Sequence, residues 1–156
     1  MTVSELTIQR QVADYIKWNY PSVIFHSDYG SGIKLTMAQA AMQNRLNGGR
    51  RSWPDMFIAE PRTITSEDGT KYTYYGLFIE LKRDDVRVFK RNGELVANGH
   101  IREQYDMLQN LYRKGYKAEF ACGFDEAKKL IDEYLDGMED GFVTFDEARR
   151  IYAKTN

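Results

Sequence analysis

Two carboxylates and one amine stand at spacings that could place them in a single site. Asp55 follows a proline in a short apolar run, residues 54–60, while Glu80 and Lys82 lie two residues apart at the end of another, residues 73–82. Because successive side chains of a strand point to opposite faces, Glu80 and Lys82 share one face and the apolar residues that alternate with them share the other. The apolar face belongs against a core, so we expect a carboxylate and an amine side by side on the opposite face.

A turn signal connects the two runs. The Asp-Gly pair at 68–69 lies between them, and Asp-Gly between apolar runs is typical of a β-hairpin. A two-residue turn there places Asp55 opposite Lys82 and makes Asp55 a diagonal neighbour of Glu80, about 7–8 Å away at the backbone. Both carboxylates then lie on one face, whereas a slip of one residue in the pairing would separate them.

These groups suit metal-assisted hydrolysis of a phosphodiester bond. That reaction needs a Lewis acid to neutralise charge developing on the phosphate and to make a water nucleophilic near neutral pH. Hard carboxylate oxygens favour Mg²⁺ or Mn²⁺, and a neighbouring lysine can orient the water, relay its proton or stabilise the charge. A solvated strand face with a Glu–Lys pair is the simpler alternative, and the matching parity of the two strands favours a site instead.

Further motifs follow one another in order along the chain. With them the sequence resembles the PD-(D/E)xK nuclease superfamily and, more closely, its VRR-NUC family of phage and repair nucleases, over roughly residues 4–135. The matching segments are Glu5-x-x-Ile8-Gln9, Gly32-x-x-Leu35-Thr36, Pro54-Asp55, residues 77–82, residues 93–96, Glu103-Gln104 and Gly115-Tyr116-x-Ala118.

The resemblance implies an α/β fold with a restriction-endonuclease-like core, in which helices flank a central mixed sheet. It implies a Mg²⁺-dependent endodeoxyribonuclease, with Mn²⁺ able to substitute. Asp55 and Glu80 would ligate the metal together with the backbone carbonyl of Leu81, and Lys82 would be the catalytic lysine. The flanking helices would add two residues to the site: Gln104, and Glu5, which is also a candidate metal ligand.

Two of these residues have simpler explanations, and two positions depart from the family. Glu5 could form a capping box with Thr2, and Gln104 could be a polar position beside the apolar stripe of its helix. Trp53 stands before Pro-Asp where the family usually has glycine. Residues 120–123, Phe-Ala-Cys-Gly, stand in place of the Val-Arg-Arg-type segment, so no basic role carries over there.

The basic residues nearest the predicted site in sequence are candidate contacts to DNA phosphates, with Tyr29 and Trp53 as candidate stacking surfaces. Ordinary charged surface is the alternative for each of them. The candidates are Lys34, Arg45, Arg50, Arg51, Arg83, Arg87, Lys90 and Arg91.

Alternating helices and strands must position these residues. Apolar residues at helical spacing predict helices at 3–18, about 36–46, 101–114 and 124–135, with Gly115 just beyond the third. Besides the two runs above, strands are predicted at 22–26 and 117–122, with a second ribbon, 86–90 and 94–97, around Asn92-Gly93. The order is that of an α/β protein.

Length and composition bound the rest. The chain has 156 residues, 42% of them apolar, and no linker-like segment, so we expect a nuclease domain at 1–135 and a helical tail of the same domain at 136–156. Its single cysteine, Cys122, excludes an internal disulfide. Without a signal-peptide pattern or a membrane-length apolar stretch, we expect a cytoplasmic protein, or a phage protein that acts in the host cytoplasm. The net charge of −1 averages a basic middle and an acidic C-terminal part.

The tail carries a partial calcium-binding pattern. Residues 136–147 have acidic residues at three ligand positions of an EF-hand loop, but Met138 occupies a fourth and cannot ligate calcium. A helix that begins with Thr144 as N-cap and Glu147 in a capping box explains the segment better.

Among functions, the family resemblance favours cleavage of branched DNA such as four-way junctions, in phage or bacterial recombination or replication, by a homodimer. The alternatives are a nicking, restriction-like or exonuclease activity, a non-catalytic DNA-binding module on the same fold, and a calcium-responsive interaction protein.

Overall fold

The computed structural model describes residues 2–29 and 33–136. Helices and strands follow in the order α1 (Glu5–Asn19), β1 (Phe25–Ser27), α2 (Met37–Leu46), β2 (Met56–Ile58), β3 (Arg62–Thr65), β4 (Lys71–Tyr74), β5 (Leu77–Lys82), α3 (Gly99–Arg113), β6 (Lys117–Cys122) and α4 (Gly123–Leu135). The EF-hand-like pattern beyond residue 136, the final predicted helix and Gly32 lie outside the described residues. Within them, no helix is long and apolar enough to cross a membrane.

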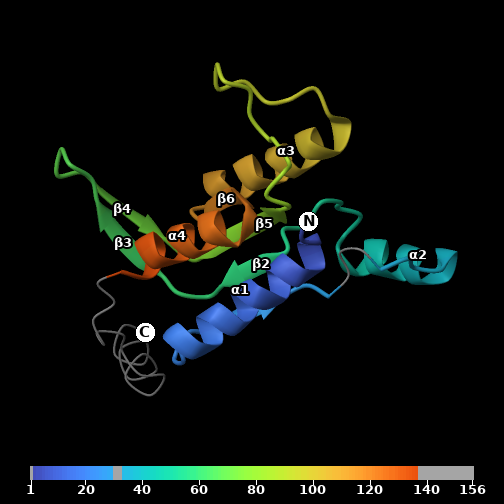
Figure 1. Cartoon of the computed structure of the whole chain (residues 1–156), viewed down its shortest axis with the longest axis horizontal. Coiled ribbons are helices and arrows are strands. Elements are labelled where there is room, and N and C mark those ends of the chain that lie inside the picture. The colour runs from blue at the N-terminus through green and yellow to red at the C-terminus, as the bar shows by residue number, and fades with distance from the viewer. Residues whose placement is uncertain (1, 30–32, 137–156) are drawn as a thin grey trace, which may run out of the picture.

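A mixed four-stranded sheet forms the centre, in the order β1-β2-β5-β6 (Figure 1). β5 pairs with β6 in parallel and with β2 antiparallel, and β2 pairs antiparallel with β1. Helices cover both faces, so the predicted α/β fold with a central mixed sheet flanked by helices is confirmed. β5 lies in the middle, and all six of its residues are buried.

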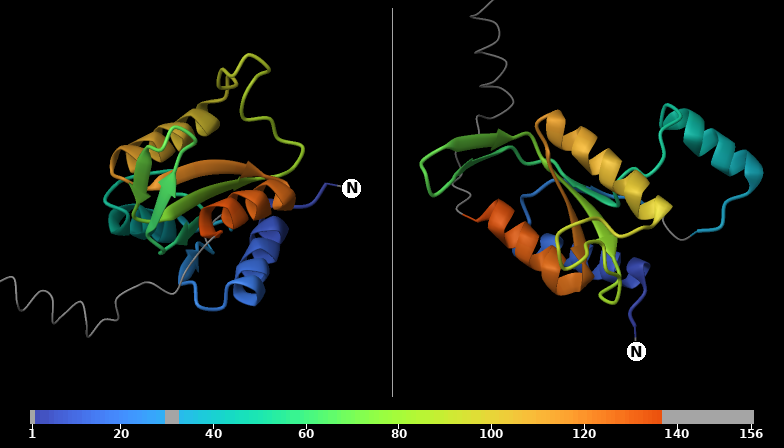
Figure 2. Two further views of the ribbon diagram at one scale, coloured as in Figure 1. Left: turned by 90° about the vertical axis from the view of Figure 1, so that its left-hand side faces the viewer. Right: turned by 90° about the horizontal axis from the view of Figure 1, so that it is seen from above.

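The helices divide between the two faces of the sheet, α1 and α4 on one and α3 on the other (Figure 2). Side chains of α1 and α4 pack with the residues of β5 that point to their face in the main core: Leu77, Ile79 and Leu81. On the other face Phe78 packs with Leu108 and Leu111 of α3. The face of β5 that carries Glu80 and Lys82 is therefore covered in part by α3 and is not simply open to solvent.

Residues 54–60 and 73–82 pair antiparallel as predicted, through β2 and β5, but the two-residue turn predicted to join them is wrong. Four short strands occupy this stretch, and β3 and β4 pair in a separate two-stranded sheet. The Asp-Gly pair is part of a five-residue connection at 66–70, because Thr65 pairs with Lys71. There Asp68 accepts a hydrogen bond from the Thr70 N–H at 2.9 Å, which stabilises the longer loop.

The register between β2 and β5 also differs from the prediction. Met56 lies opposite Ile79, so the residue before it, Asp55, faces Glu80 rather than Lys82. The shift is two residues, which keeps each side chain on its predicted face. Asp55 and Glu80 thus lie on one face, as direct rather than diagonal neighbours.

The predicted ribbon around Asn92-Gly93 forms only in part. One isolated bridge joins Phe89 to Leu95, and the turn between them is closed by the Lys90 N–H, which donates to the Glu94 carbonyl at 2.7 Å. The helix after it, α3, ends at Arg113, and Gly115 lies just beyond it as predicted, with a φ of 93° that glycine adopts without strain.

Helix α2 stands away from the rest of the molecule, joined to it by a connection at each end (Figures 1 and 2). None of its residues is buried. Its first turn is held by a capping box, in which the Thr36 hydroxyl accepts from the Gln39 N–H and the Gln39 side chain accepts from the Thr36 N–H. Local hydrogen bonds thus support a helix that contributes nothing to the core.

Candidate active site

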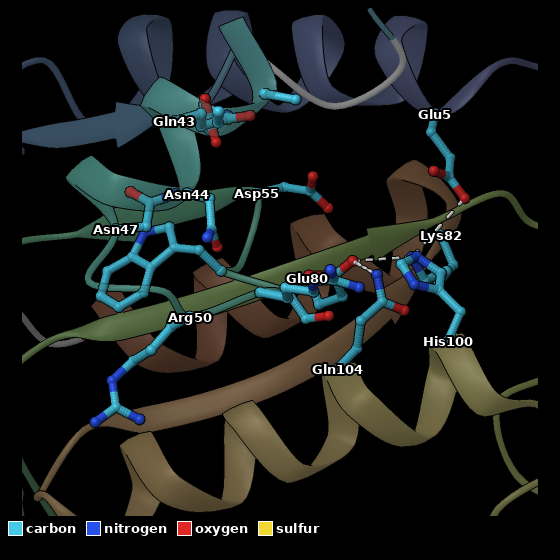
Figure 3. A pocket seen from close by; sticks show the side chains of 16 residues that line it. Glu5, Gln43, Asn44, Asn47, Arg50, Asp55, Glu80, Lys82, His100 and Gln104 are labelled. Atoms are coloured by element: carbon cyan, nitrogen blue, oxygen red, sulfur yellow. Dashed lines mark hydrogen bonds and ion pairs between the residues drawn. The ribbon is translucent and has the colours of Figure 1, made fainter. Parts of the chain in front are cut away.

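A cleft of about 730 Å³ opens between α2 and the sheet. One wall carries the side chains predicted for the site, which come from α1, the start of β2, β5 and α3: Glu5, Asp55, Glu80, Lys82 and Gln104. The opposite wall is built by α2 and the segment after it and carries Gln43, Asn44, Asn47 and Arg50 (Figure 3). Arg51 also lines the cleft. The five residues predicted to be catalytic therefore lie in one cavity.

Asp55 is fixed at the point where β2 begins. Its side chain is 8% exposed, and its Oδ2 accepts a hydrogen bond from the Leu81 N–H at 2.8 Å. Its backbone carbonyl accepts from the Asp28 N–H at 2.8 Å, and Gln9 of α1 donates to the Asp28 carbonyl at 2.5 Å. Hydrogen bonds from β5, from Asp28 just after β1 and, through Asp28, from α1 thus determine where the carboxylate lies.

Glu80 and Lys82 form a buried pair on the same face of β5. Lys82 Nζ donates to Glu80 Oε1 at 2.9 Å, as their spacing of two residues in a strand allows. Gln104 of α3 donates its Nε2 hydrogen to the same oxygen. Both polar groups around Glu80 therefore hold its carboxylate toward the cleft, where Figure 3 shows the three side chains together.

The two buried carboxylates of the site are electrostatically unfavourable when both are ionised. Burial, followed by repulsion from Asp55, raises the pKa of Glu80 to about 8, although Lys82 opposes the shift. Two carboxylates on neighbouring strands with a single ammonium group leave a net negative charge in a poorly solvated place. A proton or an added cation relieves this charge, so the site attracts cations.

The Oε1 atom of Gln104 is buried and has no hydrogen-bond partner among the described residues. A buried acceptor without a donor costs about 1–3 kcal/mol, and a water bound at a cation would supply that donor. The described residues hold no group of three or more His, Cys, Asp or Glu side chains arranged around one ion. Mg²⁺ usually takes one or two carboxylates and keeps several waters, so Asp55, Glu80 and the unpaired oxygen fit this ion.

Glu5 lies in the first turn of α1, and its carboxylate is 4.0 Å from Lys82 Nζ. The alternative explanation, a capping box with Thr2, is wrong. Ser4 is the N-cap, and its hydroxyl accepts from the Thr7 N–H at 3.2 Å. Glu5 is thus the first helical residue, with its side chain directed into the cleft (Figure 3).

The structure brings two of the eight predicted DNA-binding residues, Arg50 and Arg51, to the cleft wall. Arg83 pairs with Asp85, and Lys90 pairs with Glu94, in exposed ion pairs. The remaining four basic residues lie outside the lining of this cleft: Lys34, Arg45, Arg87 and Arg91.

Several lining residues were missed by the sequence reasoning. His100 precedes Gln104 by four residues, and this spacing places both on one face of α3. The amides of Gln43 and Asn44 in α2, and of Asn47 at its C-cap, similarly line the cleft. The helical spacing from Gln104 could have identified His100, but no sequence signal shows which face of α2 turns toward the sheet.

No protein-family model matches the sequence, and no curated protein has a significantly similar sequence. Among solved structures, the chain is similar to one described as a VRR_NUC domain protein, with a TM-score of 0.53 and 20% sequence identity. The similarity covers 85% of this chain and 88% of that one. The chain therefore has the fold of a VRR_NUC domain, the fold that its ordered motifs predicted.

Proposed function

We propose that the protein is a Mg²⁺-dependent DNA endonuclease of the VRR-NUC family within the PD-(D/E)xK superfamily, and that its sheet is the restriction-endonuclease-like core. One observation carries the proposal. Asp55, Glu80 and Lys82, all at most 8% exposed, meet at the wall of a cleft. Burying ionised groups is unfavourable unless they are paired or bind a partner, and one ammonium group does not balance two carboxylates.

Asp55 and Glu80 would hold the divalent cation, with the Leu81 carbonyl as a further ligand and Glu5 as a candidate at the edge of the site. Mn²⁺ would substitute for Mg²⁺, since both prefer oxygen ligands. When bound, the cation neutralises charge on the phosphate and makes a water more acidic. The protein supplies the position of these oxygens, which the β2–β5 pairing fixes.

Lys82 would provide positive charge beside the reacting phosphate. Its Nζ is 2.9 Å from Glu80, so it can stabilise the charge that develops during hydrolysis or orient the attacking water. Gln104 of α3 donates to the same carboxylate oxygen and helps to set the direction of the carboxylate. In this arrangement Lys82 contacts the reacting groups, and Gln104 is a positioning residue.

For the substrate, we propose branched or otherwise structured DNA, such as four-way junctions, cut by a homodimer in recombination or replication. This rests on the VRR-NUC resemblance. Nicking, restriction-like or exonuclease activity is the alternative within the same chemistry. A DNA-binding module without catalysis is the alternative outside it, and the intact set of Asp55, Glu80 and Lys82 favours an enzyme.

The test is a cleavage assay on labelled four-way junction, flap, single-stranded and duplex DNA with Mg²⁺, Mn²⁺, Ca²⁺ or a chelator. We expect cleavage of at least one substrate with Mg²⁺ or Mn²⁺ and none with the chelator. Asp55→Asn and Lys82→Ala should each lower the rate by roughly 100-fold or more. Cleavage that persists in both variants would exclude this site, and binding without cleavage of any substrate would favour the non-catalytic module.

A further inference from the structure

The segment between α2 and Asp55 is held in an unusual conformation. Gly48 and Gly49 end α2 with φ values of 63° and 74°. Ser52, with φ of 60°, is the one non-glycine residue with positive φ in the part of the chain that the structure describes. Such strain persists where the surroundings enforce it and is frequent at functional sites. Here it sets the direction of Trp53, two residues before Asp55.

Trp53 presents part of its indole to the cleft. The ring packs edge-on against Phe78, with centroids 5.2 Å apart and planes at 84°. Phe78 is itself stacked on Phe57 at 4.4 Å, so the indole rests on a fixed aromatic support. Nevertheless 46% of Trp53 remains exposed, and the residue lines the cleft. A rigid, half-covered indole beside a candidate active site is suited to stack on a flat ligand.

Two arginines accompany this indole. Arg50 and Arg51 line the same cleft, and neither is paired with an acidic side chain of residues 2–29 or 33–136. Guanidinium groups bind phosphate through paired hydrogen bonds. On the facing wall, Asn44 of α2 and Asn47, the C-cap residue of that helix, offer amides that can bond to the edge of a base (Figure 3). The cleft thus offers guanidinium groups for a phosphate, an indole for the face of a base and amides for its edge.

The exposed indole favours an unpaired nucleotide over a duplex. A cleft of about 730 Å³ has room for one nucleotide beside the candidate site. In a duplex, neighbouring base pairs cover the faces of each base, whereas an unpaired base can offer a face to an aromatic side chain. Stacking on Trp53 therefore requires a base that has left the helix.

We infer that Trp53, with Arg50 and Arg51, forms a subsite for one unpaired nucleotide next to the bond that is cut. The inference rests on the proposed nuclease function and specifies its substrate: DNA with an unpaired base at the cleavage site. The short chain distance between Trp53 and Asp55 ties the subsite to the metal-binding wall. Selectivity for distorted DNA then follows from stacking on an exposed base face.

Binding can be measured apart from cleavage, by fluorescence anisotropy in a chelator. Three short duplexes are compared: one with a single unpaired 2-aminopurine nucleotide, one with an abasic nucleotide at that place, and one fully paired. The wild type should bind the base-containing bulge roughly 10-fold or more tightly than the abasic bulge, with quenching of 2-aminopurine fluorescence by stacking. Equal affinity for the two bulges would overturn the inference without any variant.

Substitutions then show which residues cause the preference for the unpaired base. Trp53→Leu should remove the preference and the quenching, while Trp53→Phe should keep most of both. The matched control is Trp18→Leu, which removes the chain's other tryptophan, an exposed residue outside the cleft, and should change neither. Arg50→Gln and Arg51→Gln should weaken binding to all three duplexes and each lower the salt dependence by about one ion released. A folded Trp53→Leu protein that retains the preference would refute the subsite.

Cleavage separates this inference from the proposed function. With Mg²⁺ or Mn²⁺ the wild type should cut the bulged duplex next to the unpaired nucleotide. Equal cleavage of bulged and paired duplexes would support the nuclease function and contradict the subsite. Selective binding of the unpaired base without cleavage of any DNA would contradict the nuclease function and leave the subsite as a recognition site.

Discussion

The carboxylate of Asp55 closes the end of the β2–β5 ladder, because its Oδ2 accepts the backbone N–H of Leu81 at 2.8 Å. A side chain of the candidate site thus satisfies an amide that would otherwise lack its partner. Asp55 and the backbone next to Glu80 and Lys82 are coupled through this bond. The carboxylate has this structural role and, in the proposed function, a chemical one as well, and substitutions can separate the two.

Asp55→Asn should preserve the structural role and abolish the chemical one. An asparagine oxygen can still accept the Leu81 N–H, so the free energy of unfolding should change little. Asp55→Ala leaves that buried N–H unsatisfied and should lower the free energy of unfolding by about 1–3 kcal/mol. Both variants should lose cleavage by roughly 100-fold or more. Urea unfolding and rate measurements on the same preparations test this, and equal stability of the two variants would contradict it.

The elevated pKa of Glu80 makes the cation-free protein less stable as pH rises. Its pKa is about 8 in the folded protein and ordinarily 4.5, so between these values the folded state keeps a proton that the unfolded chain has released. The free energy of unfolding in a chelator should therefore fall as pH increases through this window. Glu80→Gln should flatten the dependence, and parallel pH profiles for the two proteins would argue against the shift.

Cation binding should show the opposite trend. A divalent cation must displace the proton of Glu80, so the increase in melting temperature on adding Mg²⁺ should grow with pH up to about 8. Thermal unfolding with and without Mg²⁺ across this range measures it. An increase that is independent of pH would mean that the cation binds away from Glu80.

Gln104→Met removes a positioning contact while keeping a side chain of similar length. Glu80 loses the hydrogen bond from Nε2, and the buried oxygen without a partner disappears as well, so stability should change by less than about 1 kcal/mol. The affinity for Mg²⁺ should fall by roughly 10- to 100-fold, as for other residues that orient ligands. Excess Mg²⁺ should restore much of the cleavage rate, whereas failure to recover would assign Gln104 to the chemistry itself.

Asp132 joins α1 to α4 outside the lining of the cleft, so its substitution should change stability and not cleavage. Its Oδ1 accepts from the hydroxyls of Tyr15 and Tyr20 at 2.5 and 2.7 Å, and its Oδ2 accepts from Lys128 at 2.7 Å. Asp132→Asn should lower the free energy of unfolding by about 1–3 kcal/mol without affecting cleavage below the melting temperature. Glu133→Gln, which breaks the exposed pair with Lys129, is the control and should cost less than about 1 kcal/mol.

The pH dependence of this variant has a definite sign. Burial opposes ionisation of Asp132, but hydrogen bonds from Lys128, Tyr15 and Tyr20 outweigh it and lower its pKa. The stabilisation is therefore present above the ordinary pKa of about 3.9 and is lost as pH falls through the lowered folded value. Wild type and Asp132→Asn should therefore converge in stability only as pH falls below this lowered pKa, and a constant difference across that range would contradict this.

The sequence predicted the common face of Asp55, Glu80 and Lys82 because alternation along a strand depends only on parity. It failed on the connection, since Asp68-Gly69 closes a separate hairpin, and a local turn signal does not reveal which strands it joins. The error in register was two residues, which parity cannot detect. Direct opposition of Asp55 and Glu80 required knowing that β3 and β4 leave the main sheet.

The second wall of the cleft was beyond sequence reasoning for another reason. Helix α2 (Met37–Leu46) was predicted at nearly its observed position, about 36–46, and Arg50 and Arg51 were candidates for DNA contact. The two connections of α2, including Ser52 with its positive φ, determine which face of the helix turns toward Glu80. The helix has no apolar stripe from which this face could be predicted. His100 was missed because it reaches the cleft only through the position of α3 against β5.

Since no residue of α2 is buried, this wall of the cleft can change in sequence without a change in the core. Substitutions in β5, whose six residues are all buried, would instead affect the core and the candidate site together. The helix can therefore diversify, or be exchanged for another, on an unchanged sheet.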